Sequence, residues 1–230
     1  DGSAFVNAEA EASRADLSFR LRDFIGMFDT RLTMYVQEVD AGYSAPMLPE
    51  EAGGKGWTRD LAHAVTRTLA AKEVLGPPTG LGMMLAAPTI AAHGTPEQIE
   101  TYVKPIINGQ QAWCQLFSEP GAGSDVAGLA TKAIKDGDEW VVNGQKVWTT
   151  LAHLSKWGLL VVRTDPNAVK HAGLTAFVVD MEDPTVEIRP LRQMTGEAEF
   201  NEVFFSDTRI PDSEMLGGAG DGWRVSLTTL

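Results

Sequence analysis

The spacing of apolar residues changes near Trp113, and this change constrains the fold more than any other feature of the sequence. Upstream, FRLRDFIGMFDTRLTMYVQEV places Phe24, Met27, Phe28 and Leu32 at steps of three and four residues, which indicates an amphipathic helix. Downstream, short alternating segments separated by turn residues predict seven or eight strands with no helix between them. This order predicts an α+β chain in which a helical part precedes a small barrel or sandwich.

Three further helices are expected before the strands. The first runs from Thr58 to Leu75 and is ended by Gly-Pro-Pro. The segment GLGMMLAAPTIAAHG is apolar on almost every side, which predicts a buried helix. In TPEQIETYVKPI, Thr95 is a cap-like residue, with a proline at the first helical position and a glutamate shortly after it.

Hairpin signals stand out in the second part, where TKAIKDGDEWVVNGQKVWTT contains Asp136-Gly137 and Asn143-Gly144 between strand-like residues. Because Asn-Gly between alternating segments is the strongest short-range hairpin signal, we expect turns at these dipeptides. Further strands are predicted in WGLLVVRTD, GLTAFVVDM, VEIRPL and NEVFFSDTRI. The final GGAGDGWRVSLTTL begins another helix, so we expect the sequence to be the front part of a longer protein.

Composition narrows the class of partner and compartment. The 230 residues carry a net charge of −12, which argues against binding to nucleic acid or to an anionic membrane. No apolar run is long enough to span a bilayer. The single cysteine, Cys114, excludes an internal disulfide framework and suits a reducing compartment. We therefore expect a cytoplasmic protein, or one that matured elsewhere after cleavage of a leader.

The glycine-rich segment FSEPGAGSDVAG, residues 117–128, is the main candidate for ligand binding. A dinucleotide fingerprint would need glycine where Val126 stands, and a phosphate-binding Walker loop would need lysine where Leu129 stands. The GAGS backbone can still offer successive N–H groups to an anion. Considered alone, the motif favours an ordinary turn between strands.

Other chemistries have weaker support. The four histidines are scattered and lack zinc-ligand spacing, and there is no nucleophile-elbow motif. Cys114 lies in an apolar run and is interpreted as a buried small hydrophobe.

Several segments together resemble the acyl-CoA dehydrogenase family: WCQLFSEPGAGSDVAGLATKA, GDEWVVNGQKVWTT, RTDP, GTPEQIETYVKPIINGQ and FNEVFFSDTRIPDSEMLGG. The resemblance covers residues 49–230 well and the first 48 weakly. It implies an α-helical N-terminal domain at residues 1–111 and a flavin-binding β-barrel middle domain at 112–217. Residues 218–230 would begin a truncated C-terminal helical bundle.

The resemblance also implies a site for FAD. The segment from Gln115 to Ser124 would pass the flavin and its phosphates, and the motif WTT would stack on and hydrogen-bond the isoalloxazine. The implied cofactor residues are Gln115, Phe117, Ser118, Gly123, Ser124, Trp148, Thr149 and Thr150. Ser124 would also touch the nucleotide tail of the substrate. Glu119 and Asp125 are assigned to turn structure rather than catalysis.

An acyl-chain slot is expected beside the apolar helix, with Met84 and Leu85 facing it. Core packing is the alternative for both side chains, because methionine at helical spacing commonly fills interior gaps.

The implied reaction is α,β-dehydrogenation of an acyl-CoA thioester, with electrons passed to an electron-transfer flavoprotein. The family's catalytic base would lie beyond Leu230, so the 230-residue chain alone is expected to lack normal activity and to bind FAD weakly. A homodimer or homotetramer is expected, with a heteromer possible.

Two alternatives stay open: an acyl-CoA oxidase or flavin monooxygenase on the same scaffold, and a non-catalytic subunit of a heteromeric complex. The acyl chain can be short, branched, long or a steroid side chain.

Overall fold

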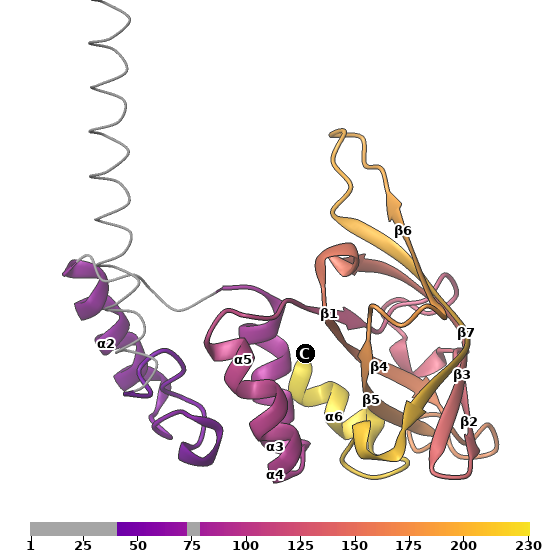
Figure 1. Ribbon diagram of the computed structural model, residues 1–230, viewed down its shortest axis with the longest axis horizontal. Helices are drawn as coiled ribbons and strands as arrows, with labels where there is room; N and C mark the ends of the chain where they lie inside the picture. Colours follow the sequence, from indigo (N-terminus) through magenta and orange to yellow (C-terminus); the bar gives the residue numbers. More distant parts are fainter. Residues whose placement is uncertain (1–40, 73–78) are drawn as a thin grey trace, which may run out of the picture.

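The structure is a computed structural model that describes residues 41–72 and 79–230. The helix predicted around Phe24 lies outside this range, as do the last residues of the helix predicted from Thr58. Figure 1 shows helical segments on one side and a strongly curved β domain on the other. The described helices are η1 (Glu50–Ala52), α2 (Arg59–Ala71), η2 (Gly82–Ala86), α3 (Ala87–His93), α4 (Pro96–Gln98), η3 (Ile99–Val103), α5 (Lys104–Ile107) and α6 (Gly222–Thr229), and the short turns η4 (Val126–Gly128), η5 (Ala152–Leu154) and η6 (Asp212–Glu214) lie among the strands, where no helix was predicted.

The helix start predicted at Thr95 is confirmed in detail. The Thr95 side chain accepts a hydrogen bond from the Gln98 amide, and the Gln98 side chain accepts one from the Thr95 amide. Pro96 occupies the first helical position. The reciprocal bonds form a capping box, and Gln98 closes it rather than the neighbouring glutamate. Gln98 also donates to the carbonyls of Ser213 and Met215, which ties this helix to the end of the β domain.

Eight strands form one mixed sheet, which confirms the predicted fold class. Their order is β6-β7-β3-β2-β4-β5-β8, and β1 pairs in parallel with β4. The longest ladder joins β3 to β7 in antiparallel register. The strands are β1 (Trp113–Leu116), β2 (Lys132–Asp136), β3 (Glu139–Thr150), β4 (Trp157–Arg163), β5 (Leu174–Asp180), β6 (Val186–Leu191), β7 (Phe200–Pro211) and β8 (Met215–Leu216).

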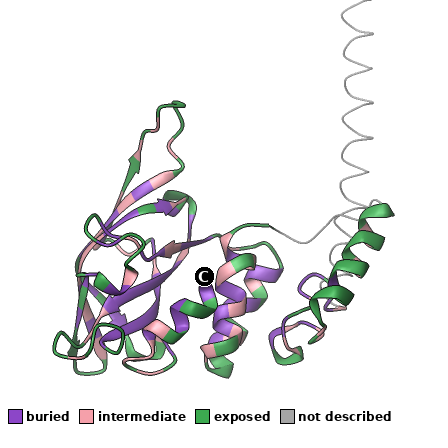
Figure 2. Cartoon of the chain, turned by 180° about the vertical axis from the view of Figure 1, so that it is seen from behind, coloured by how far each residue is buried: buried purple, intermediate pink, exposed green. Residues whose placement is uncertain are grey.

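β4 is apolar on both faces because it separates two hydrophobic cores. Leu160 and Val162 face a core inside the curved sheet, where they pack with Phe177. Leu159 and Val161 point to the opposite face and join the side chains of the helical part. Figure 2 shows the central strands as buried, whereas the β6–β7 arm is exposed toward its tip. The helices therefore cover one outer face of the β domain.

The turn predicted at Asn143-Gly144 is wrong, because β3 runs through this dipeptide without reversing. A Cβ on Gly144 would lie 2.4 Å from Thr131 Oγ1 and 2.7 Å from Thr131 Cα, so glycine is required here for close approach of the neighbouring chain. Asn143 instead exchanges two hydrogen bonds with Asp207 on β7, where that strand carries a bulge. The turn predicted at Asp136-Gly137 is confirmed as the connection between β2 and β3.

Helix α6 packs directly on β5. A Cβ on Gly222 would lie 2.6 Å from the backbone of Leu174 and Thr175, so the first turn of α6 sits against the strand itself. Across residues 41–72 and 79–230, none of the helices has the length and apolar character needed to cross a lipid bilayer.

Candidate functional site

Trp148 lies in a β-bulge near the end of β3. Three steps along β3, from Lys146 to Thr149, face only two steps along β7, from Val203 to Asn201. The extra residue leaves Trp148 with a φ of 60°, in the left-handed region that non-glycine residues rarely adopt. Trp148 is 62% exposed, and its ring meets the Phe200 ring edge-on at a centroid distance of 6.1 Å. The bulge therefore presents a large aromatic face outward at a cost in backbone strain.

Thr149 and Thr150 complete β3 with different environments. Thr149 is buried, and its Oγ1 has no hydrogen-bond partner within the part of the chain that the structure describes. Its carbonyl accepts a hydrogen bond of 2.9 Å from the side chain of Asn201. Thr150 is half-buried and pairs with Phe200 in the ladder.

The glycine-rich loop, residues 120–129, lies beside this strand end. The Val147 amide donates to the Ser118 carbonyl at 2.9 Å, which joins the start of the loop directly to the bulge. The amides of Gly123 and Ser124 donate to no atom among the described residues. A Cβ on Gly123 would meet nothing within 4 Å. The chain itself therefore does not require glycine at this position, and the two amides are free to meet an anion.

The two ends of the glycine-rich loop are held by a buried ion pair. Glu119 Oε1 lies 2.8 Å from Lys146 Nζ, and the two side chains are 6% and 0% exposed. Burial lowers the pKa of Lys146 to about 8, against the attraction of Glu119. Burial acts to raise the pKa of Glu119, but Lys146 and the bonds from Ala130 and Thr131 hold it below its ordinary value. Both groups are therefore charged near neutral pH, and the assignment of Glu119 to turn structure agrees with its contacts.

The far end of the loop is fixed to the neighbouring strands. Arg163 donates to the carbonyls of Ala127 and Leu129 at 2.7 and 3.2 Å. Asp125 forms an ion pair with Lys170 in the β4–β5 connection, which also agrees with a role in turn structure. Only the middle of the loop, around Gly123, is left without such restraint.

The remaining sequence-predicted site residues are spread more widely. Gln115 is half-buried on β1, and the Phe117 side chain packs in the core shared with the helices. Met84 is 68% exposed on η2, so core packing does not describe it; its neighbour Met83 packs against the core instead. Leu85 is half-buried on the same turn. Helix η2 contacts β1.

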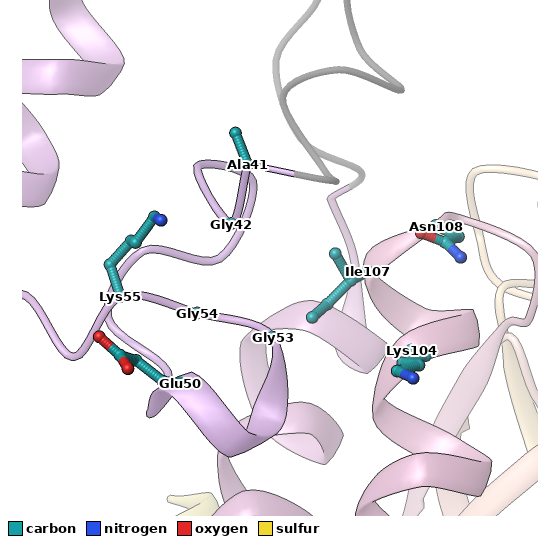
Figure 3. Close-up of a pocket in the computed structure, with 9 residues that line it drawn as sticks. All are labelled: Ala41, Gly42, Glu50, Gly53, Gly54, Lys55, Lys104, Ile107 and Asn108. Carbon is teal, nitrogen blue, oxygen red and sulfur yellow. The ribbon is translucent and has the colours of Figure 1, made fainter.

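Two pockets differ in their relation to this site. Figure 3 shows a pocket between residues 41–55 and α5. Its volume is about 460 Å³, and none of the predicted site residues lines it. A pocket of about 300 Å³ lies against the glycine-rich loop and is lined by Glu119, Pro120, Gly121, Gly128, Ala130, Thr131, Gly144 and Gln145. Glu119, one member of the buried ion pair, therefore lines a hollow in the surface.

Sequence reasoning missed Lys146 and Asn201, two buried residues that bond to Glu119 and to the Thr149 carbonyl respectively. Both signals were available in part: β3 alternates with Trp140 and Val142 facing inward, and the same parity turns Lys146 inward. The partner of that lysine could not be read from the alternation. Asn201 shares the parity of the buried Val203 and Phe205 on β7, but its partners Thr149 and His153 could not be read from the alternation either.

Comparison with known proteins identifies the scaffold. A family model for the acyl-CoA dehydrogenase N-terminal domain matches residues 8–110, and one for the middle domain matches residues 114–208. The helical part followed by a mixed β domain is the fold of acyl-CoA dehydrogenase N-terminal and middle domains. The chain belongs to the acyl-CoA dehydrogenase family.

Individual relatives support the same family assignment. Acyl-CoA dehydrogenase FadE34 of Mycobacterium tuberculosis is 49% identical over 191 residues, covering 83% of this chain and 27% of FadE34. The ChsE4–ChsE5 complex of the same organism matches with a TM-score of 0.70 and 32% identity, over 90% of this chain and 53% of that one. A structure described as the Tcur3481–Tcur3483 steroid ACAD matches with a TM-score of 0.72 and 27% identity, over 95% of this chain and 60% of that one. The chain thus spans from about a quarter to 60% of the length of these proteins.

Proposed function

We propose that the protein containing this chain is an FAD-dependent acyl-CoA dehydrogenase, which desaturates the α and β carbons of an acyl-CoA thioester. The observation that carries the proposal is Trp148, held exposed in a left-handed bulge beside a loop with free amides. The family match supports the same reading, because acyl-CoA dehydrogenases use FAD.

The residues present fit this cofactor. An exposed indole offers an apolar face to a flat ring system. The buried Thr149 Oγ1 lacks a partner among the described residues and can hydrogen-bond a ring edge. The open space at Gly123 and its free amide suit a phosphate group. Each of these features is left unexplained by packing within the described chain.

In this proposal each side chain has a limited task. Trp148 stacks on the flavin, while Thr149 and Thr150 hydrogen-bond its edge. The backbone of Gly123 and Ser124 binds the pyrophosphate, and Ser124 also meets the nucleotide of the substrate. Supporting contacts come from Gln115, Phe117 and Ser118, and the acyl chain passes Met84 and Leu85.

When bound, FAD supplies the acceptor for the hydride that leaves the β-carbon. The chain's own residues orient the ring and exclude water around it. Neither carboxylate in the segment FSEPGAGSDVAG suits the role of proton acceptor, because Glu119 is bound by Lys146 and two amides, and Asp125 pairs with Lys170. As the family resemblance implies, we assign the base to a part of the protein beyond Leu230, and expect the 230-residue chain alone to be inactive and to bind FAD weakly.

Several finer features belong to the same proposal. Reduced flavin would pass its electrons to an electron-transfer flavoprotein, in a cytoplasmic homodimer or homotetramer. The domains would divide at residues 1–111, 112–217 and 218–230. Among acyl chains, the steroid class is favoured because a steroid enzyme is named among the structural relatives.

The test uses the full-length protein isolated with its flavin. Anaerobic addition of an acyl-CoA thioester should bleach the flavin absorbance, and an electron-transfer flavoprotein should restore it. Replacing Trp148 with Ala should weaken FAD binding by roughly tenfold, on the scale of a lost aromatic pair. The matched control is Leu154→Ala, which shortens a comparably exposed apolar side chain outside the assigned set. Absence of bleaching with acyl-CoA thioesters of every chain class would refute the proposal, and oxygen consumption without another acceptor would indicate an oxidase.

A second candidate function is a subunit of a heteromeric complex, since two structural relatives, ChsE4–ChsE5 and Tcur3481–Tcur3483, are each named as a pair of proteins. If this is correct, the protein co-purifies with a second chain, and flavin is retained only when both chains are present.

A further inference from the structure

Lys146 is the one lysine among the described residues with a fully buried side chain. Lysine side chains are rarely buried unless their charge is paired. Lys146 Nζ donates to the Phe117 carbonyl at 3.1 Å and to Glu119 Oε1 at 2.8 Å. The lysine lies two residues before Trp148, immediately ahead of the bulge. One ammonium group therefore connects the strand that carries the indole to the segment that enters the glycine-rich loop.

Glu119 extends this connection to the other end of the loop. Its Oε2 accepts a hydrogen bond of 2.6 Å from the Ala130 amide, and its Oε1 accepts one of 3.0 Å from the Thr131 amide. A single carboxylate thus closes both ends of residues 120–129. The loop, its exit and β3 meet at one buried pair of charges.

Stability alone is a weak reason for such an arrangement. Burying two charges requires desolvation that their attraction only partly offsets, and well-packed apolar residues commonly serve as well. A buried ion pair with its hydrogen bonds does, however, fix the distance and direction between the groups that it joins, whereas an apolar contact fixes neither. Here the directions it specifies are those of the loop amides and of Trp148.

We propose that Lys146 and Glu119 are positioning residues for the cofactor site, which hold the free amides of the glycine-rich loop at a set distance from the Trp148 ring. This inference rests on the proposed function. The pair touches neither the ring nor the phosphates: it acts through the backbone of residues 117–119 and 130–131 and through the bulge. FAD affinity and the flavin environment should therefore depend on the pair even in variants that are fully folded.

The experiment compares full-length protein carrying Lys146→Met, Glu119→Gln or both changes. FAD dissociation constants are measured by quenching of flavin fluorescence, at a temperature where circular dichroism shows each variant to be folded. Visible spectra of the bound flavin report its environment. Lys104→Met is the control, because it removes an exposed lysine that pairs with Glu100.

We expect each single change to raise the FAD dissociation constant at least tenfold and to alter the flavin spectrum. The double variant should regain much of the lost resistance to urea, because no charge is left unpaired, but should not regain FAD affinity. If a single variant fails to fold, the double variant carries the test. Recovery of affinity together with stability, or affinities within twofold of the unmodified protein, would overturn the inference. If the unmodified protein binds no FAD, the proposed function fails as well.

Discussion

Asn201 offers the sharpest test of how the strand end is held. Its side chain is 0% exposed, and Nδ2 donates to the carbonyls of Thr149 and Glu199 at 2.9 and 3.2 Å. These two bonds fix the orientation of the amide, so Oδ1 must accept the bond from His153 Nδ1 at 3.0 Å. The replacement Asn201→Asp changes one group and keeps the volume, but it places an oxygen against two carbonyl oxygens that now receive hydrogen bonds.

The expected cost follows from that geometry. The buried Thr149 carbonyl would lose its side-chain donor, whereas the exposed Glu199 carbonyl keeps the bond from the Leu151 amide. Because a buried acceptor that loses its donor costs about 1–3 kcal/mol, the change should reduce the free energy of unfolding by about 1–3 kcal/mol near neutral pH. Repulsion between the new carboxylate and the two carbonyls acts in the same direction. The loss should shrink in acid, because a protonated carboxyl group can again donate one hydrogen bond.

The assay is urea unfolding of the full-length protein, followed by tryptophan fluorescence and circular dichroism at several pH values. Asn167→Asp provides a control for the same chemical change at an exposed position, where about 0.5 kcal/mol or less is expected. Asn201→Leu removes the donors without adding charge and should show no acid recovery. The reasoning is refuted if Asn201→Asp and Asn167→Asp have equal unfolding free energies at neutral pH.

Three further changes test other parts of the structure. Lys146→Met should cost about 3–5 kcal/mol in urea unfolding because it leaves a buried charge unpaired, whereas Lys104→Met at an exposed pair should cost under about 1 kcal/mol. In the folded state the pKa of Glu119 lies below its ordinary value of 4.5. Its ionised form therefore stabilises the protein above pH 4.5, and this stability is lost as the pH falls through the folded-state pKa. Glu119→Gln should reduce the resulting decline of the melting temperature in acid. Gly222→Ala should cost about 1–3 kcal/mol by forcing α6 away from β5, and equal melting temperatures for it and Gly218→Ala, whose Cβ would meet only a side chain at 3.3 Å, would contradict this packing.

Much of the fold could be predicted because its signals are local. The alternation in VEIRPL and the apolar run in WGLLVVRTD correspond to β6 and β4, and the cap at Thr95 starts a helix. The turn predicted at Asn143-Gly144 was wrong because the glycine is required by a residue that is distant in the sequence. The glycine is needed because Thr131 approaches it, and a dipeptide signal cannot distinguish that need from a turn.

Some features of the candidate site could likewise be predicted from the sequence, and others could not. The residues of the glycine-rich loop and of the motif WTT could be proposed from the sequence, since a family resemblance is carried by contiguous motifs. The bond between Val147 and Ser118, which places the two segments together, was not visible in either motif. Nor was the outward exposure of Met84, which helical spacing had suggested would be buried.

Residue order alone was enough to establish the succession of helices and strands, the capping at Thr95 and the family, because period, capping chemistry and motif identity are properties of neighbouring residues. The three-dimensional structure was needed to decide that Lys146 meets Glu119, which lies 27 positions earlier in the chain, and that the bulge turns Trp148 outward. Alternation can place a lysine on an inward face, but whether its charge is tolerated there depends on which distant group the fold brings to it.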